Sequence, residues 1–472
     1  MTWSHEVVID AVVDEWILSH QAEMLEAMKR LIRIRSVGQG FFPGQAHPFG
    51  EGCAQAVDQT RELITMAGLQ VKEHDYYGIS AVYPGDTQRA ISFFSHLDVV
   101  PEGSGWSFDP YDPFVKDGYL FGRGAADNKG AVIGVLYVLK FLRDHNIQLN
   151  HTVTAFFGCN EESGMRDVAY YLRSDTPSFS MVSDGFFPLG NGEKGILTAD
   201  FVANVSDSNL LSFTAGELSN VIPYSASAVI RGFSALEVQS ALGESFTVTE
   251  SARGLRVETV GAGGHAAFPT GTINPIPKLA KALLECGLLT GKAREAAVFI
   301  ASAFADYYGN GLHLDFEDEA SGKTTHTTGI VRLTEGKLIV NVNIRYAVLA
   351  NAQVLIDRMR EVGAEYGFTL VNIEDNPPFY VPESDPIVQR LADLANHMLK
   401  TDMPTYVMGG ATHARKLPYA VSFGPSRSDI GNPFPAGRGK PHQPDEALRL
   451  QDIWDSIKIY IHAVLMLDKM VD

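Results

Sequence analysis

The stretch RAISFFSHLDVVPEG, residues 89–103, joins an apolar run to a histidine and an aspartate two positions apart. The apolar run is typical of a buried strand, and Pro101 marks its end. Side chains at positions i and i+2 of a strand point to the same side, so His96 and Asp98 are expected to share one side of the sheet. One ring nitrogen could then bind a metal while a carboxylate holds the other. The fragment taken alone favours the simpler interpretation, in which both residues only cap a loop.

Strands and helices alternate around this stretch, from about residue 71 to residue 184. Two further apolar strands are expected at HTVTAFFGCN (151–160) and FSMVSDG (179–185), with an apolar helix at 129–146. This order predicts an α/β fold, in which helices cover both faces of the sheet. Ligands of such sheets bind beyond the carboxyl ends of the strands. The side chains that follow these strands are His96, Glu161, Glu162 and Asp184.

The pattern changes after Gly192. Alternating segments such as GKLIVNVNIRYAV (336–348) predict antiparallel strands, and helical patterns begin near residues 274 and 352. We therefore expect a catalytic domain in two parts, 1–191 and 377–472, interrupted by an inserted α+β domain at 192–376. The proline-rich linker at 376–386 would carry the return crossing.

Composition limits the classes of function. The chain has 472 residues and a formal net charge of −18, which argues against binding to nucleic acid or to an anionic membrane. Cys53, Cys159 and Cys286 show no metal-finger spacing and indicate a reducing compartment. The N-terminal segment lacks the features of a signal peptide, and no stretch is apolar enough to span a bilayer. We expect a cytoplasmic protein.

Further candidate ligands lie outside the strand ends. FGRGAADNKG (121–130) places Asp127 in a glycine-rich turn, and GKPHQPDE (439–446) places His442 in a polar loop. Each has an ordinary explanation, such as a helix cap for Asp127 or a solvated acid for either glutamate. Together they supply two histidines and three carboxylates. The three carboxylates and one bound hydroxide would neutralise two divalent cations, and the two neutral imidazoles would complete the coordination. Mixed nitrogen and oxygen ligands suit zinc, and also manganese or cobalt.

The order of the motifs resembles a known family. SHLDVVP, GRGAADNKG, GCNEESG, SDG, GGHAAFP, NIRY and HQPDE are similar to the co-catalytic metallopeptidase family of aminoacylase, succinyl-diaminopimelate desuccinylase and carboxypeptidase G. The long insert and the strings LSNVIP and GGATHAR look most like its PepV-type dipeptidase branch, relatives of carnosinase. The resemblance covers essentially the whole chain.

This resemblance implies a role for each candidate, either as a cation ligand or in catalysis. His96 and Asp184 would bind one cation, Glu162 and His442 the other, and Asp127 would bridge them. Glu161 would be the general base, and Asp98 would orient His96. The Asp127–Asn128 peptide bond is expected to be cis.

The insert would then act as a lid that contacts substrate. His265 in GGHAAFP resembles an oxyanion-stabilising histidine, and Asn220 and Arg345 resemble substrate-contacting residues. Arg345 suits a bidentate clamp on a terminal carboxylate, a role that the backbone of Gly409 and Gly410 could also fill. Read without the family, His265 is an exposed loop histidine and Arg345 an ordinary surface arginine.

Three positions depart from the family pattern. Ala347 stands where proline is common, His413 where tyrosine is common, and Pro441 where alanine often precedes the last ligand. None removes a ligand, so the departures bear on substrate specificity.

These observations predict a metal-dependent dipeptidase. Glu161 would take a proton from a water held between the two cations, and the water would attack a dipeptide that has a free C-terminal carboxylate. One alternative is an N-acyl amino acid deacylase, of the desuccinylase or deacetylase type, at the same dinuclear site. The other is a non-catalytic peptide-binding relative, although a pure binder has no need of a general base. We expect a small peptide substrate and a monomeric protein.

Overall fold

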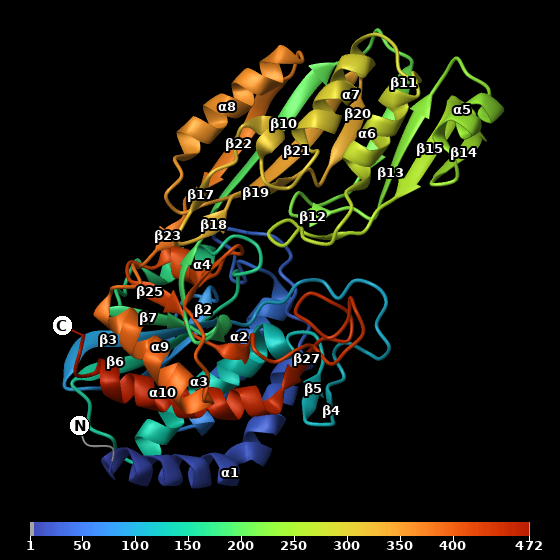
Figure 1. Ribbon diagram of the computed structural model, residues 1–472. Coiled ribbons are helices and arrows are strands. Elements are labelled where there is room, and N and C mark those ends of the chain that lie inside the picture. Colours follow the sequence, from blue (N-terminus) through green and yellow to red (C-terminus); the bar gives the residue numbers. More distant parts are fainter. Residues whose placement is uncertain (1–3, 472) are drawn as a thin grey trace. The chain divides into compact units, whose positions relative to one another are not determined.

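The computed structural model describes residues 4–471; residues 1–3 and 472, which the predicted domain ranges include, lie outside the described part. The chain divides into two compact units (Figure 1). Unit 1 comprises Met1–Asn191, Val381–Tyr406 and Ala411–Asp472, and unit 2 comprises Gly192–Tyr380 and Val407–Gly410. The short segment Val407–Gly410 therefore belongs to unit 2, whereas the sequence-based range 377–472 assigned it to the catalytic domain.

Unit 1 is built on a sheet with a parallel centre. In sheet order its strands are β1 (Gln70–Glu73), β2 (Gly78–Tyr83), β6 (His151–Gly158), β3 (Thr87–His96), β7 (Phe179–Val182) and β25 (Ala420–Ser422). The pairs β6–β3, β3–β7 and β7–β25 are parallel, while β1 and β2 are antiparallel. The sheet continues beyond β25 with β9 (Gly190–Glu193), which pairs antiparallel with β25. The α/β prediction is confirmed.

Helices from distant parts of the sequence pack together in unit 1. The helices are α1 (Ser4–Ile32), α2 (Glu51–Met66), α3 (Gly130–Asp144), α4 (Arg166–Tyr171), α9 (Pro386–Leu399) and α10 (Leu450–Leu467). α10 packs against α3 and α1, and α3 also contacts β2, β3 and β6 (Figure 1). Positions 130–142 of α3 are buried throughout, because the helix lies between the sheet and α10. This position explains why its sequence is apolar nearly all round.

Short elements of unit 1 carry the loops around the sheet edge. β4 (Phe114–Lys116), β5 (Tyr119–Phe121) and β27 (Ala447–Arg449) form a small antiparallel sheet, and β8 (Gly185–Phe187) pairs with β26 (Pro425–Arg427). One wide helical turn, η1 (Ala125–Lys129), leads directly into α3, and η3 (His413–Lys416) precedes β25.

Unit 2 is an antiparallel sheet with helices. In sheet order its strands are β14 (Phe246–Ser251), β15 (Gly254–Val260), β13 (Ser225–Ile230), β11 (Leu210–Ala215), β20 (Val331–Thr334), β21 (Lys337–Tyr346), β10 (Gly195–Asn204) and β22 (Thr369–Asn376), with β19 (Thr325–Thr327) beside β21. The helices are α5 (Ala235–Leu242), α6 (Pro275–Glu285), α7 (Lys292–Ala303) and α8 (Ala352–Glu365). Alternate residues of β10, such as Leu197, Ala199 and Phe201, are buried in one core with α6 and α7.

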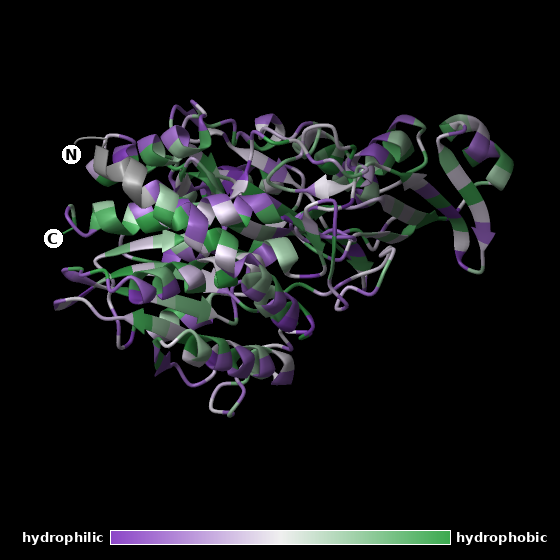
Figure 2. Ribbon diagram, turned by 90° about the horizontal axis from the view of Figure 1, so that it is seen from below, coloured by the Kyte–Doolittle hydropathy of each residue, from purple (hydrophilic) through white to green (hydrophobic). Residues whose placement is uncertain are grey.

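The remaining elements of unit 2 are short. They are β12 (Val221–Ile222) paired with β16 (Gly264–His265), β17 (Glu317–Asp318) paired with β18 (Gly322–Lys323), η2 (Asn310–Leu312) and β23 (Phe379–Tyr380). β24 (Tyr406–Met408) leads into the returning segment. Figure 2 shows helices that carry both apolar and polar residues along their length, as amphipathic surface helices do. Among residues 4–471, no helix has the length and apolarity that a membrane crossing needs.

Candidate metal centre

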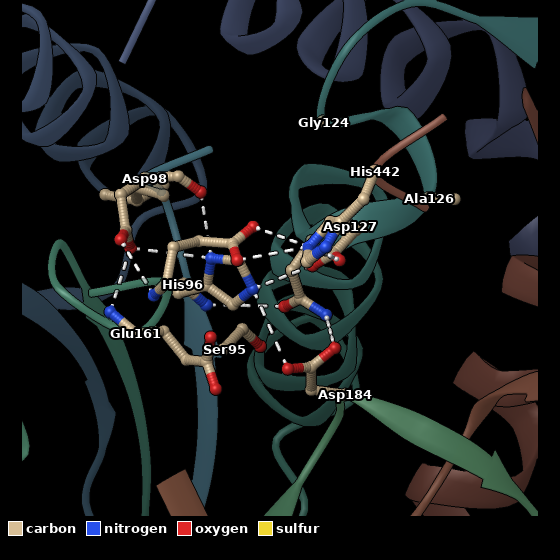
Figure 3. A network of polar contacts seen from close by, with 12 residues as sticks. Ser95, His96, Asp98, Gly124, Ala126, Asp127, Glu161, Asp184 and His442 are labelled. Carbon is tan, nitrogen blue, oxygen red and sulfur yellow. Dashed lines mark hydrogen bonds and ion pairs between the residues drawn. The ribbon is translucent and has the colours of Figure 1, made fainter. Parts of the chain in front are cut away.

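Three adjacent parallel strands bring the predicted ligands of unit 1 together. His96 is the last residue of β3, Glu161 and Glu162 follow β6, and Asp184 follows β7. The register pairs His96 with Gly158 of β6, so the glutamates begin just beyond the histidine. Figure 3 shows His96, Glu161 and Asp184 of this group close together at the carboxyl edge of the sheet.

His96 presents a defined nitrogen to this edge. The ring is fully buried, and its Nδ1 lies 2.9 Å from the backbone carbonyl oxygen of Asp98. A carbonyl only accepts hydrogen bonds, so Nδ1 carries a proton and the neutral ring has its lone pair on Nε2. Nε2 lies 2.9 Å from Asp127 Oδ1 and 3.7 Å from Asp184 Oδ2. This is the tautomer that a cation at Nε2 requires.

Asp127 lies between the two predicted histidine ligands. Its Oδ1 faces His96, and its Oδ2 lies 3.1 Å from Nε2 of His442. The same His442 nitrogen is 3.1 Å from Glu162 Oε2. The Asp127–Asn128 peptide bond is cis, which confirms that expectation. A carboxylate that turns one oxygen toward each histidine has the arrangement of a bridging ligand.

The donor atoms fit divalent cations. One ligand atom each from His96, Asp127 and Glu162 lie within 4.8 Å of one another, and the same holds for His96, Glu161 and Asp184. Imidazole nitrogens and carboxylate oxygens in this mixture suit zinc, manganese or cobalt. Both adjacent glutamates lie within reach of a cation, so their division into base and ligand stays a prediction.

Glu161 is a buried carboxylate with an unmatched oxygen. Its side chain is 9% exposed, and Oε1 has no hydrogen-bond partner among the described residues. Burial raises the pKa of Glu161 well above that of an ordinary glutamate, and the carboxylates of Asp184, Glu162 and Asp127 act in the same direction. A buried acceptor without a hydrogen-bond donor lowers the stability of the fold, unless a ligand or water supplies the donor. Oε1 of Glu161 is therefore available for a hydrogen bond from a bound molecule.

Asp98 contacts the two glutamates as well as His96, the residue that the sequence analysis linked to it. Its buried carboxylate accepts the backbone N–H groups of Glu161 at 3.2 Å and Glu162 at 3.1 Å. The carboxylate oxygen Oδ1 also lies 3.5 Å from Nδ1 of His96, the residue that it was predicted to orient. Asp98 thus connects the histidine at the end of β3 to the glutamate pair after β6.

Burial and neighbouring charges shift the titration of the other candidate ligands. Burial, assisted by Asp127, raises the pKa of Asp184 to about 6 and that of Glu162 to about 7. For His442, burial opposes the charged form, but the hydrogen bonds to Asp127 and Glu162 outweigh it and raise the pKa to about 11. Metal ligands of this kind must be deprotonated to bind a cation, so cation binding at this cluster would depend on pH.

The predicted substrate residues all lie in unit 2. His265 pairs with Val221 through β16 and β12, and the N–H of Ala266 donates to the backbone carbonyl of Asn220 at 2.9 Å. Asn220, which directly precedes β12, therefore lies beside the segment that carries His265.

Arg345 lies against the returning segment of unit 2. It is 5% exposed, its Nη1 donates to the carbonyl of Gly409 at 3.2 Å, and its Nε donates to Asn343 at 3.0 Å. A Cβ added at Gly409 would lie 3.0 Å from that of Ala267, two residues after His265. Unit 2 thus gathers Arg345, Gly409 and the His265 loop, with Gly410 next in the chain. Arg345 is not the surface arginine that its sequence context alone would suggest.

Two of the three residues that depart from the family pattern, His413 and Ala347, form polar contacts in the structure. His413 is buried and lies 3.1 Å from the buried carboxylate of Asp167. Ala347 donates its backbone N–H to Thr324 Oγ1 at 3.2 Å, a bond that a proline could not make. Pro441 is exposed beside His442.

Glu446 is a residue near the centre whose role was not predicted from the sequence. Glu446 closes the quoted motif HQPDE, yet it received no role. It is fully buried and accepts the backbone N–H of Asp127 at 3.1 Å. The only signal was its place four residues after His442, which fits many loop acids equally well.

Comparison with known proteins identifies the family. The sequence profile described as peptidase family M20/M25/M40 matches residues 93–466. The chain belongs to this family. The match confirms the motif resemblance and spans the five predicted cation ligands, from His96 to His442. The protein is a metallopeptidase of the M20 family.

Relatives of this M20 peptidase carry dipeptidase names. The protein named "Putative dipeptidase YtjP" from Bacillus subtilis (strain 168) is 30% identical over 468 residues, which cover 96% of this chain and 99% of the relative. The structure of the dipeptidase Dug1p from Saccharomyces cerevisiae matches with a TM-score of 0.59 at 12% identity, covering 98% of both chains. Human carnosine dipeptidase 1 gives a TM-score of 0.58 at 15% identity, covering 98% of this chain and 99% of that one. The two structures show that the fold is shared.

Proposed function

We propose that this M20 peptidase is a dipeptidase that hydrolyses dipeptides with a free C-terminal carboxylate, using two divalent cations, preferably zinc. The observation that carries the proposal is the buried Glu161, whose Oε1 has no hydrogen-bond partner among residues 4–471 and which lies near two histidines that both contact Asp127. The dipeptidase names of the relatives support the choice of substrate.

Residues of unit 1 would hold the cations in two groups. His96 and Asp184 would be ligands of one cation, Glu162 and His442 would be ligands of the other, and Asp127 would serve both. When bound, a pair of such cations activates water and polarises the carbonyl of the scissile bond. The N–H bonds from the glutamate turn to Asp98 keep the two glutamates in place during turnover.

Glu161 moves the proton in this proposal. Its carboxylate takes a proton from the attacking water and later donates it to the nitrogen of the leaving amine. Burial favours the protonated form that arises between these two steps. The hydrogen bond from the backbone N–H of Glu161 to Asp98 holds the main chain that carries this side chain.

The tautomer of His265 supports a role as an oxyanion donor. The backbone N–H of Ala267 donates to Nδ1 of His265 at 3.1 Å. Since Nδ1 accepts, the neutral ring carries its proton on Nε2, which is then the donor that an oxyanion needs. We propose that Arg345, beside Gly409, binds the terminal carboxylate of the same substrate, and that Asn220 contacts it near His265.

The test is a substrate panel. Chelator-treated protein is reloaded with Zn²⁺, Mn²⁺ or Co²⁺ and incubated with free dipeptides, C-terminally amidated dipeptides and N-acyl amino acids. We expect cleavage of free dipeptides, strong loss of cleavage after amidation, and no cleavage by Glu161→Gln. Exclusive cleavage of N-acyl amino acids would replace the dipeptidase proposal with a deacylase, and binding without cleavage of any substrate would contradict an enzyme.

A further inference from the structure

Glu446 holds the turn that carries the predicted bridging ligand. It is fully buried, and its Oε1 accepts the backbone N–H groups of Ala126 at 2.9 Å and Asp127 at 3.1 Å. Its Oε2 accepts the N–H of Gly124 at 3.1 Å. Figure 3 shows this turn, with Gly124, Ala126 and Asp127 beside His442. Glu446 therefore bonds to the turn of one ligand while it belongs to the loop of another.

The charge of Glu446 is matched by a buried arginine. Nη1 of Arg123 donates to Glu446 Oε2 at 2.6 Å, and Arg123 is 1% exposed. The guanidinium lies 5.1 Å from the ring centre of Trp106 and donates to the carbonyl of Glu102 at 3.4 Å. A buried carboxylate is stable when it is paired and fully hydrogen-bonded, and both conditions hold here.

The backbone fixes where this carboxylate lies. β27 pairs antiparallel with β5 so that Ala447 faces Phe121, and the N–H of Gly122 donates to the carbonyl of Glu446 at 3.0 Å. The ladder places Glu446 next to the start of the 122–127 turn, and its side chain then reaches the N–H groups of that turn.

We propose that Glu446 is a positioning residue of the metal centre, which fixes the carboxylate of Asp127 relative to His442. This inference rests on the proposed metal-dependent function. Without these bonds the turn loses the acceptor for the N–H of Asp127 itself, so the bridging carboxylate is free to move away from His96 and His442. Both cations should then bind more weakly, because Asp127 contacts both.

The arrangement requires a carboxylate rather than an amide. Both oxygens of Glu446 receive N–H donors from different groups. A glutamine would turn its NH₂ group toward one of these sets of donors, where it can accept nothing. Glu446→Gln therefore disrupts these hydrogen bonds while it leaves the size of the side chain nearly unchanged.

Asp468 provides a matched control in the same unit. It is 7% exposed and accepts the backbone N–H groups of His151 at 2.8 Å and Asn150 at 3.1 Å, with no contact to a predicted cation ligand among the described residues. Asp468→Asn thus removes a similar buried carboxylate away from the metal centre.

The experiment titrates chelator-treated protein with Co²⁺ and follows its visible absorption, which reports the geometry of the ligands, together with thermal unfolding in chelator. We expect Glu446→Gln to stay folded, to lose about 10–100-fold in Co²⁺ affinity, and to change the absorption spectrum, whereas Asp468→Asn changes stability alone. If Glu446→Gln does not fold, Glu446→Asp replaces it, with a smaller loss of affinity in the same direction.

Two results would overturn the inference: a folded Glu446 variant with the affinity and spectrum of the unmodified protein, or an equal loss of affinity in Asp468→Asn. Failure of the unmodified protein to bind Co²⁺ at all would instead contradict the proposed function. The two failures are therefore distinguishable.

Discussion

Replacing Asp98 with alanine removes the acceptor for two N–H groups of the glutamate turn. The N–H of Glu161 is buried and that of Glu162 is partly buried, and both bonds are close to 3.1 Å. A buried donor left without a partner costs about 1–3 kcal/mol, so the two together should cost about 2–4 kcal/mol of the free energy of unfolding, the partly buried group costing less. Removing a residue that orients a metal ligand typically lowers metal affinity about 10–100-fold, or about 1.4–2.8 kcal/mol of binding free energy.

The assay separates these two quantities. Thermal or urea unfolding in excess chelator gives the stability of the metal-free protein, and calorimetric titration with Zn²⁺ gives the affinity. Asp468→Ala is the matched control, because it also removes a buried carboxylate that accepts two backbone N–H groups. We expect both variants to lose stability and only Asp98→Ala to lose affinity.

An Asp98→Ala variant that binds Zn²⁺ as tightly as the unmodified protein and keeps its activity would contradict the predicted role of Asp98. Asp98 would then only cap a loop, and the position of the glutamate turn would not depend on its carboxylate. A loss of affinity of the same size in Asp468→Ala would assign the effect to general destabilisation.

Further predictions concern single residues. Glu161→Ala should abolish turnover and leave the cation content unchanged by elemental analysis; loss of a cation would mean that the adjacent glutamates have exchanged roles. His265→Ala should lower kcat about 100–1,000-fold with little change in KM, since a transition-state donor is lost, whereas the exposed control His313→Ala should change neither. Arg345→Ala should raise KM for free dipeptides and spare amidated ones; equal effects on both would place the carboxylate clamp elsewhere. Backbone N–H groups hold the pKa of Asp468 below 3.8 although burial opposes them, so it stabilises the fold above that pH. The stability difference between the unmodified protein and Asp468→Asn should therefore shrink as the pH falls below 3.8, and a constant difference would contradict this.

The fold of unit 1 follows from short-range patterns in the sequence. The apolar runs before His96 and Glu161 form β3 and β6, and their parallel pairing is what brings the two residues to one edge. The carboxyl ends of neighbouring parallel strands must meet, so the location of the site follows once the strands are recognised. The identity of its ligands needed the motifs, because a histidine or glutamate at a strand end is common.

The supporting contacts could not be predicted from such patterns. Glu446 and Ala126 are 320 positions apart, and their hydrogen bond depends on the pairing of β27 with β5, each only three residues long. Strands of this length have too few side chains to show a period. The same reason explains why the return of Val407–Gly410 to unit 2, beside Arg345, was not expected.

One physical principle connects the supports that sequence analysis missed or described incompletely. Asp98, Asp167 and Glu446 are buried carboxylates that each accept backbone N–H groups from a loop next to predicted ligands. Each would add negative charge to a site already rich in carboxylates, and that charge needs compensation when no cation is bound. Asp98 lies beside His96, and the other two lie beside His413 and Arg123, respectively. The histidine that departs from the family pattern therefore has a contact in unit 1: Nε2 of His413 lies 3.1 Å from the Asp167 carboxylate, which accepts the backbone N–H of Asn160 at the start of the glutamate loop.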